Sequence, residues 1–189
     1  PVHADIYWQL SESVRGMGNM AREISVPVVG GNVSLYNESD EMLTRIQPTP
    51  SIGMVGSVSV TQPVQPEVGM GLAICGKAGA HFGGSVLDAV FSCGGTPPPK
   101  ADPTILKTVR SLVASDSGVA VTDISQGGLA AALATFLPGA RVKIGGPALP
   151  ALFSETYGMF LIAYHDESSL RGLGYSTIGE VAAEGLEIR

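Results

Sequence analysis

A short stretch after the first apolar run combines a flexible backbone with amide and hydroxyl chemistry. Gly30 and Gly31 end a β-branched run, and Asn32 and Ser34 come soon after them. Because glycine has no Cβ, its backbone can take a positive φ and let a phosphate oxygen approach the N–H groups. The Asn32 amide oxygen is a neutral hard ligand suited to Mg²⁺, and Ser34 falls on the same side in an extended chain. The pattern predicts a phosphate or metal site.

A purely structural interpretation of the same stretch is also open. The two glycines could form a β-bulge that leads into a hairpin, with residues 37–40 as its turn. Asn32 would then satisfy backbone groups rather than a ligand. Residue chemistry alone does not decide between the two interpretations.

A second candidate lies where a predicted strand meets a predicted helix. The sequence DISQGG places Asp123, Ser125 and a glycine pair at this junction. Backbone N–H groups at the start of a helix bind anions readily, so this junction is a candidate anion site. The alternative is that Ser125 or Gln126 caps the helix and the glycines permit close packing.

The remaining chemical candidates favour structural roles. The loop 77–85 (KAGAHFGGS) is glycine-rich, but its spacing fits neither common phosphate-binding pattern, so a structural turn is expected. His3, His81 and His165 have no partner at recognisable metal or triad spacing. We expect each to be an ordinary surface or packed histidine.

The elements that must position the first candidate are a helix and several strands. Apolar residues at helical spacing predict an amphipathic helix, namely Ile6, Leu10, Val14, Met17, Ala21 and Ile24. Strands are predicted at 26–29, 33–36 and 52–60, with a polar hairpin near 38–41. No strand precedes the helix, so we expect the chain to begin in mid-domain, with the helix packed on a sheet whose other strands are absent.

The Pro- and Gln-bearing segment 61–67 predicts a boundary between domains 1–62 and 63–189. In the second domain, Asp102 and Pro103 predict a helix start. Strands are expected near 70–75, 119–124, 141–144 and 159–164, helices near 85–91, 103–113, 129–137, 151 and 167–173, and a terminal hairpin from 177–182 and 186–189. This alternation predicts an α+β fold, a mixed sheet layered with helices.

Composition excludes several classes of protein. The net charge is −6 without a Lys/Arg cluster, which argues against nucleic-acid and anionic-membrane surfaces. Cys75 and Cys93 are too few for a disulfide framework and too isolated for a zinc site. The longest apolar run, 129–137, is far shorter than a membrane span, and no signal peptide is visible, so we expect a cytoplasmic protein.

The sequence GGNVSLYNE, followed by PTPSIGMVG, resembles the phosphoribosylformylglycinamidine synthase family, in its synthetase subunit. The resemblance covers nearly the whole chain. It implies that residues 1–62 are the trailing part of a second N-terminal-type, ATP-binding domain. It also implies that residues 63–189 form a second C-terminal-type domain of the aminoimidazole ribonucleotide synthase-like fold.

The resemblance implies an ATP-dependent C–N ligase of purine biosynthesis. Such an enzyme converts formylglycinamide ribonucleotide and glutamine-derived ammonia to the amidine, with ATP and Mg²⁺ as cofactors. Gly31, with Gly30, would lie against the nucleotide, Asn32 would bind Mg²⁺, and Ser34 would contact the substrate. No catalytic residue is expected here, because the family's catalytic histidine would lie upstream of Pro1.

The same resemblance implies partners for the chain. They are a glutaminase subunit or domain, a small accessory subunit and the upstream half of the chain itself. Neither nucleic acid nor membrane is expected. The 189 residues alone are expected to be inactive.

Departures from the family pattern keep other interpretations open. Gln126 stands where the family usually has an acid, and Glu155, Thr156 and Tyr157 stand where it has the substrate-contacting triplet E-S-Q. Met159 replaces an arginine, so this element is expected to be a degenerate pseudo-site. One alternative is therefore a non-catalytic, nucleotide-binding scaffold. Another is a different ATP-using relative, such as aminoimidazole ribonucleotide synthase, selenophosphate synthetase, thiamine-phosphate kinase or a hydrogenase-maturation protein.

Overall fold

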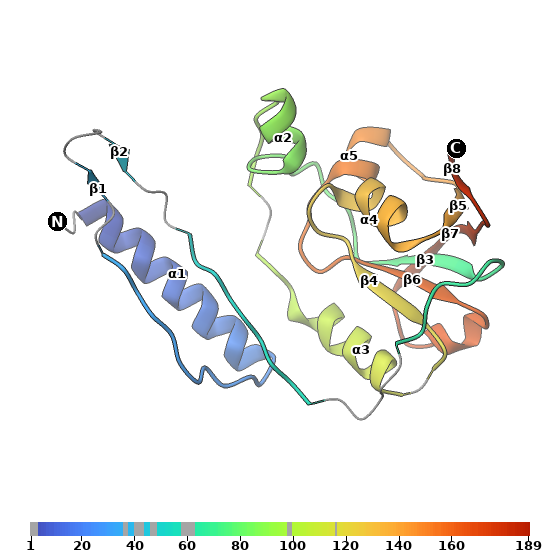
Figure 1. Ribbon diagram of the computed structural model, residues 1–189, viewed down its shortest axis with the longest axis horizontal. Helices are drawn as coiled ribbons and strands as arrows, with labels where there is room; N and C mark the ends of the chain where they lie inside the picture. The colour runs from blue at the N-terminus through green and yellow to red at the C-terminus, as the bar shows by residue number, and fades with distance from the viewer. Residues whose placement is uncertain are drawn as a thin grey trace. The chain divides into compact units, whose positions relative to one another are not determined.

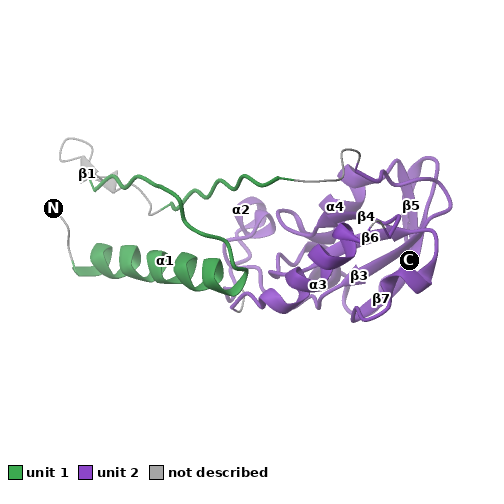
Figure 2. Ribbon diagram, turned by 90° about the horizontal axis from the view of Figure 1, so that it is seen from below, with its two compact units in different colours: residues 1–58 green, residues 59–189 purple. Residues whose placement is uncertain are grey.

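The structure is a computed structural model of the 189-residue chain. It forms two compact units, Pro1–Val58 and Ser59–Arg189, which Figure 2 colours separately. Each unit is described by itself. The structure describes residues 4–35, 38–39, 44–45, 49–57, 63–97, 100–115 and 117–189.

Unit 1 contains the predicted amphipathic helix, α1, which spans Ala4–Glu23. None of its residues is fully buried, and the predicted apolar stripe is only partly covered. Tyr7, Trp8 and Val14 each expose more than half of their surface. The helix prediction is confirmed, but within the described residues its apolar face has little to pack against.

The three predicted strands of unit 1 are wrong over the described residues. Segments 26–29, 33–35 and 52–57 belong to no strand, and Val29 and Val55 are almost fully exposed. A β-branched pattern becomes a strand only when a neighbour supplies ladder hydrogen bonds, and no described segment pairs with these. Tyr36 and residues 58–60 lie outside the described residues.

The hairpin of unit 1 is short. Strand β1, Glu38–Ser39, pairs antiparallel with β2, Thr44–Arg45, as the predicted polar hairpin requires. The turn between them lies outside the described residues.

Unit 2 is built on a six-stranded mixed sheet in the order β4-β6-β3-β7-β5-β8. All neighbours pair antiparallel except β5 and β8, which are parallel. This confirms the α+β prediction. The strands are β3 (Gly71–Cys75), β4 (Ala120–Asp123), β5 (Gly139–Val142), β6 (Phe160–Tyr164), β7 (Tyr175–Val181) and β8 (Gly185–Ile188).

The predicted terminal hairpin is wrong. β5 lies between β7 and β8, so the last two strands do not pair with each other. The chain passes close to the start of β5, where a Cβ on Gly139 would lie 2.5 Å from the carbonyl carbon of Glu184. A glycine at this position permits the passage that places β8 beyond β5.

Helices cover both faces of the sheet (Figure 1). Helices α4 and α5 cover one face, where Leu129 and Leu133 pack with Leu161 of β6. Helix α3 and a 3-10 turn, η1, cover the other face, where Val109 packs with Ile162. The helices of unit 2 are α2 (Val86–Phe91), α3 (Pro103–Ala114), α4 (Gly128–Phe136), α5 (Ala148–Phe153) and η1 (Glu167–Leu170).

Strand alternation explains the two cores. Leu161 and Ile162 are both fully buried but point to opposite faces, because successive side chains of a strand alternate. Each such side chain contributes about 1.5–3 kcal/mol through its burial.

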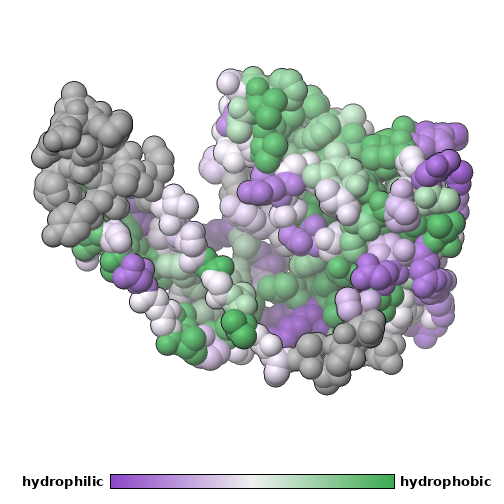
Figure 3. Space-filling view, in the orientation of Figure 1, coloured by the Kyte–Doolittle hydropathy of each residue, from purple (hydrophilic) through white to green (hydrophobic). Residues whose placement is uncertain are grey.

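Figure 3 shows a hydrophobic surface over α2, where Val90 and Phe91 are 65% and 72% exposed.

The N-cap of α3, Asp102, is expected to make the stability of the fold depend on pH in the acid range. Asp102 accepts a hydrogen bond from Thr104 N at 2.9 Å, and hydrogen bonding from the Thr104 side chain and from this backbone N–H lowers the pKa of the Asp102 carboxyl. A lowered pKa in the folded state contributes stability above the carboxyl's unfolded pKa, and the contribution is lost as pH falls through the folded pKa. Asp102→Asn keeps a capping oxygen without a charge, so we expect a melting temperature that depends less on pH in the acid range than that of the wild type.

The matched variant for this comparison is Asp102→Ala, which removes the cap itself. We expect it to melt below the wild type at neutral pH, whereas Asp102→Asn stays closer to it. Thermal unfolding followed by circular dichroism at several pH values measures both effects. Parallel pH profiles for the wild type and Asp102→Asn would contradict the assignment.

Candidate functional site

The predicted site residues of unit 1 lie on one exposed segment. Gly30, Gly31, Asn32 and Ser34 are all exposed and belong to no strand. Neither glycine has a positive φ, so the predicted left-handed backbone is not present. A Cβ built on either glycine would meet nothing within 4 Å. The described residues therefore give no packing reason for these glycines, and the predicted β-bulge is also absent there.

Metal binding by this segment would depend on other groups. Among the described residues, no cluster of three or more His, Cys, Asp or Glu could hold a metal ion. Asn32 offers one neutral oxygen, whereas Mg²⁺ requires near-octahedral coordination. Its chemistry therefore fits at most one ligand of a Mg²⁺ site.

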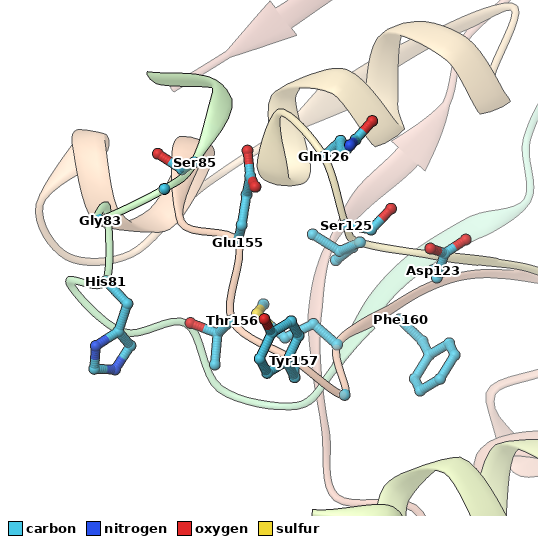
Figure 4. A pocket seen from close by; sticks show the side chains of 14 residues that line it. His81, Gly83, Ser85, Asp123, Ser125, Gln126, Glu155, Thr156, Tyr157 and Phe160 are labelled. Carbon is cyan, nitrogen blue, oxygen red and sulfur yellow. The ribbon is translucent and has the colours of Figure 1, made fainter. Parts of the chain in front are cut away.

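A pocket of about 420 Å³ lies within unit 2. Three segments that are distant in sequence form its walls: the loop before α2, the turn before α4 and the segment before β6 (Figure 4). Strand register explains why they meet. Phe160 at the start of β6 pairs with Cys75 and with Asp123, the last residues of β3 and β4. All three segments therefore emerge at one edge of the sheet.

The glycine pair before α4 has a packing role. Gly127 and Gly128 have φ values of 78° and 68°. A Cβ on Gly128 would lie 2.6 Å from the carbonyl oxygen of Leu152 in α5. Close helix packing, one of the two interpretations of this motif, is therefore present. Ser125 and Gln126 do not cap α4, because its N-cap is Gly127, which makes no side-chain cap bond.

Glu155 supplies the missing cap from another segment. Its Oε1 accepts hydrogen bonds from the backbone N–H of Gly127 at 2.9 Å and of Val86 at 2.8 Å. Next to it, Thr156 Oγ1 accepts a hydrogen bond from Gly79 N at 3.1 Å. The segment that resembles a degenerate substrate site thus holds the pocket walls together.

The remaining pocket residues supply little positive charge. Asp123 and Glu155 line the pocket with His81, and the described lining residues include neither Lys nor Arg. His81 Nδ1 lies 3.4 Å from the Oγ1 of Thr96, while Tyr157 is 61% exposed. The pocket is therefore lined by hydrogen-bonding groups with an acidic bias.

Known proteins similar to this chain indicate the family to which it is related. The model of the AIR synthase related protein, N-terminal domain, matches residues 2–58. The phosphoribosylformylglycinamidine synthase subunit PurL of Methanosarcina barkeri is 39% identical to the chain. The alignment is 207 positions long and includes the whole chain. The chain is homologous to part of this subunit. The PurL subunit of Methanosarcina mazei is 37% identical, also over the whole chain.

The chain spans only 29% of the length of these two PurL subunits. The family model covers the segment with Gly30, Gly31, Asn32 and Ser34, whereas the pocket of unit 2 lies outside it. Both regions lie within the alignments to PurL. The assignment of residues 63–189 to a C-terminal-type domain stays a prediction.

The histidines and cysteines form no second site among the described residues. His165 Nε2 lies 3.6 Å from Glu67 Oε2 on the surface, and His3 lies outside the described residues. Burial raises the pKa of the Cys75 thiol, which disfavours the reactive thiolate, and Cys93 is exposed. Of the described helices, none combines the length and apolar character needed to cross a membrane.

The sequence predictions missed the role of Glu155 and the meeting of the three pocket segments. A usable signal was present, because each segment directly follows or precedes an apolar strand. Their meeting also requires β3 and β4 to run in the same direction on either side of β6. Local sequence patterns do not predict which strands lie on either side of β6.

Proposed function

We propose that the chain is part of an ATP-dependent amidine ligase of purine biosynthesis. The enzyme converts formylglycinamide ribonucleotide and glutamine-derived ammonia to formylglycinamidine ribonucleotide. The observation that carries this proposal is the match of the entire chain, at 39% identity, to a phosphoribosylformylglycinamidine synthase subunit. A match that includes both units supports this ligase over the other ATP-using relatives.

Unit 1 provides one wall of the nucleotide and substrate site in this proposal. Gly30 and Gly31 let a phosphate approach the backbone, and their open surroundings leave room for it. Asn32 contributes one oxygen to Mg²⁺, and the Ser34 hydroxyl contacts the substrate. ATP supplies the phosphoryl group and Mg²⁺ neutralises its charge, so the task of these residues is positioning.

The proposal includes partners and a cellular location. Ammonia would come from a glutaminase subunit or domain, with a small accessory subunit in the same assembly. Other parts of the synthase subunit would complete the site, since the chain spans 29% of the relatives' length. The cytoplasm is the proposed location, where purine synthesis would take place.

A non-catalytic scaffold role is the second candidate for unit 2. Glu155 is engaged by Val86 and Gly127, and Met159, where the family has an arginine, is buried. These two observations favour a structural role over substrate turnover in this pocket. A tightly held nucleotide in a Ser34→Ala enzyme with undiminished turnover would favour the scaffold for the whole chain.

We predict that the purified 189-residue chain forms no amidine by itself. Its described residues hold no metal cluster, and the proposed site residues lie on an exposed segment that supplies only one wall. The measurement is product formation with ATP, Mg²⁺, ammonia and formylglycinamide ribonucleotide. Turnover above the background without protein would refute this prediction.

The proposal itself is tested by replacement. The segment of Methanosarcina barkeri PurL that aligns with the chain is exchanged for the chain, and the resulting replacement subunit is assayed with ammonia. Amidine formation at a rate comparable to that of the parent subunit is expected.

A further inference from the structure

Glu155 joins two helix starts that lie far apart in the sequence. Its Oε1 accepts hydrogen bonds from Val86 N, the first residue of α2, and from Gly127 N, the N-cap of α4. The N–H groups at a helix start have no partner within the helix, so they require a side chain, water or a ligand. Figure 4 shows Glu155 between the loop that carries Ser85 and the turn before α4.

The neighbouring residues hold the same loop at a second point. Thr156 Oγ1 accepts a hydrogen bond from Gly79 N and lies 2.8 Å from Ser154 Oγ. Ser154 and Thr156 are only 2% and 8% exposed. Because segment 154–156 holds the loop near both of its ends, the position of this pocket wall depends on that segment.

The Glu155 carboxylate also affects which ligands the pocket can bind. N–H groups at helix starts carry partial positive charge and attract anions. Here Glu155 already brings a negative charge to them, and Asp123 adds another on the pocket wall. Among the described lining residues there is neither Lys nor Arg. An anion without a bound cation would meet two carboxylates and donors that are already engaged.

We propose that Glu155 is the positioning residue of this pocket and that it excludes free anions such as inorganic phosphate. It occupies the place beside Val86 and Gly127 that such an anion would take, and it fixes the loop of α2 against the start of α4. Glu155 therefore holds the pocket walls in place without a bound ligand. The pocket is suited to neutral ligands or to anions that are paired with a cation. This role differs from the substrate contact that the E-S-Q triplet makes in the family, and it stands independently of the proposed ligase activity.

The test uses backbone amide NMR on the complete chain. The wild type is compared with Glu155→Gln, which keeps an acceptor oxygen, and with Glu184→Gln, a matched change on the exposed turn before β8. In the wild type, the amide signals of Val86 and Gly127 are expected to shift together with one common midpoint as pH is lowered. In Glu155→Gln this common shift is expected to be lost, whereas Glu184→Gln retains it.

Other titratable groups around the pocket are present in all three proteins. They are His81 on the loop, Asp123 on β4, Tyr157 before β6 and Asp88 on α2, whose carboxylate accepts from Gly84 N and Gly94 N. The Gly84 and Gly94 amides should therefore follow Asp88 equally in every variant. A difference confined to Val86 and Gly127 identifies Glu155 as its cause.

Inorganic phosphate provides a measurement that needs no variant. Added to the wild type at neutral pH, it is expected to leave the amide signals of Val86 and Gly127 unchanged. Saturable shifts of both signals would overturn the proposed exclusion of anions. An unchanged common titration of the two amides in Glu155→Gln would overturn the positioning role.

Discussion

Gly128→Ala is expected to destabilise unit 2 by about 3 kcal/mol, or to prevent its folding. The alanine would have to adopt a φ near 68°, which costs about 1–2 kcal/mol for a residue with a Cβ. Its Cβ would also lie 2.6 Å from the carbonyl oxygen of Leu152 and 2.8 Å from Cα of Phe153. Both atoms belong to the backbone of α5, so relief requires α4 and α5 to separate, which costs a further 1–3 kcal/mol or so.

Gly118→Ala is the matched control for this prediction. Gly118 has a φ of 65°, but a Cβ there would meet nothing within 4 Å. This variant is expected to lose only the free energy of unfolding that the positive φ costs a residue with a Cβ, about 1–2 kcal/mol. Urea unfolding of both variants measures the difference. Equal losses of unfolding free energy would contradict the packing role of the glycine pair and would reopen a ligand-binding role for it.

Asn32→Ala is expected to lower amidine synthesis by the replacement subunit on the order of 100-fold. Its amide oxygen is the one Mg²⁺ ligand that the proposal assigns to this chain, and alanine supplies no oxygen in its place. Asn32→Asp keeps an oxygen ligand and should lose less activity. Steady-state rates at several Mg²⁺ concentrations distinguish a lost ligand, because excess Mg²⁺ would then partly restore the rate of Asn32→Ala.

Asn19→Ala is the control for the loss of an amide side chain in unit 1. Asn19 is exposed on α1, where its Oδ1 accepts a hydrogen bond from Arg22. Its removal is expected to change the rate by less than about twofold, as is usual for an exposed surface position. If Asn32→Ala were equally mild, Asn32 would not be a metal ligand.

Local signals predicted most of unit 2. Asp102 and Pro103 mark the start of α3, because a capping carboxylate and a fixed φ act on adjacent residues. The strand β6 and helix α4 follow from short apolar runs with glycine or proline at their ends. In each case the deciding interactions lie within a few residues of one another.

Features that depend on distant partners were not predictable in this way. Segments 26–29 and 52–57 carry a strand pattern but lack described neighbours, so they form no ladder. The prediction of a terminal hairpin was wrong because β5, which lies more than thirty residues before β7 in the sequence, pairs with β7 in place of β8.

The candidate sites show the same division. The chemistry of Asn32 and Ser34 was readable from residue types, but the described residues include no cluster of three or more His, Cys, Asp or Glu that could hold a metal ion. Glu155 acts on Val86 and Gly127, which lie 69 and 28 residues away in sequence. No local motif indicates those two contacts.

The most direct test of the proposed ligase function is the rate of amidine formation by the replacement subunit with ammonia, ATP, Mg²⁺ and formylglycinamide ribonucleotide. We expect a rate comparable to that of the parent PurL subunit, and a large loss when Asn32 is replaced by alanine. A replacement subunit that folds and binds ATP, yet forms no amidine, would contradict the proposed function.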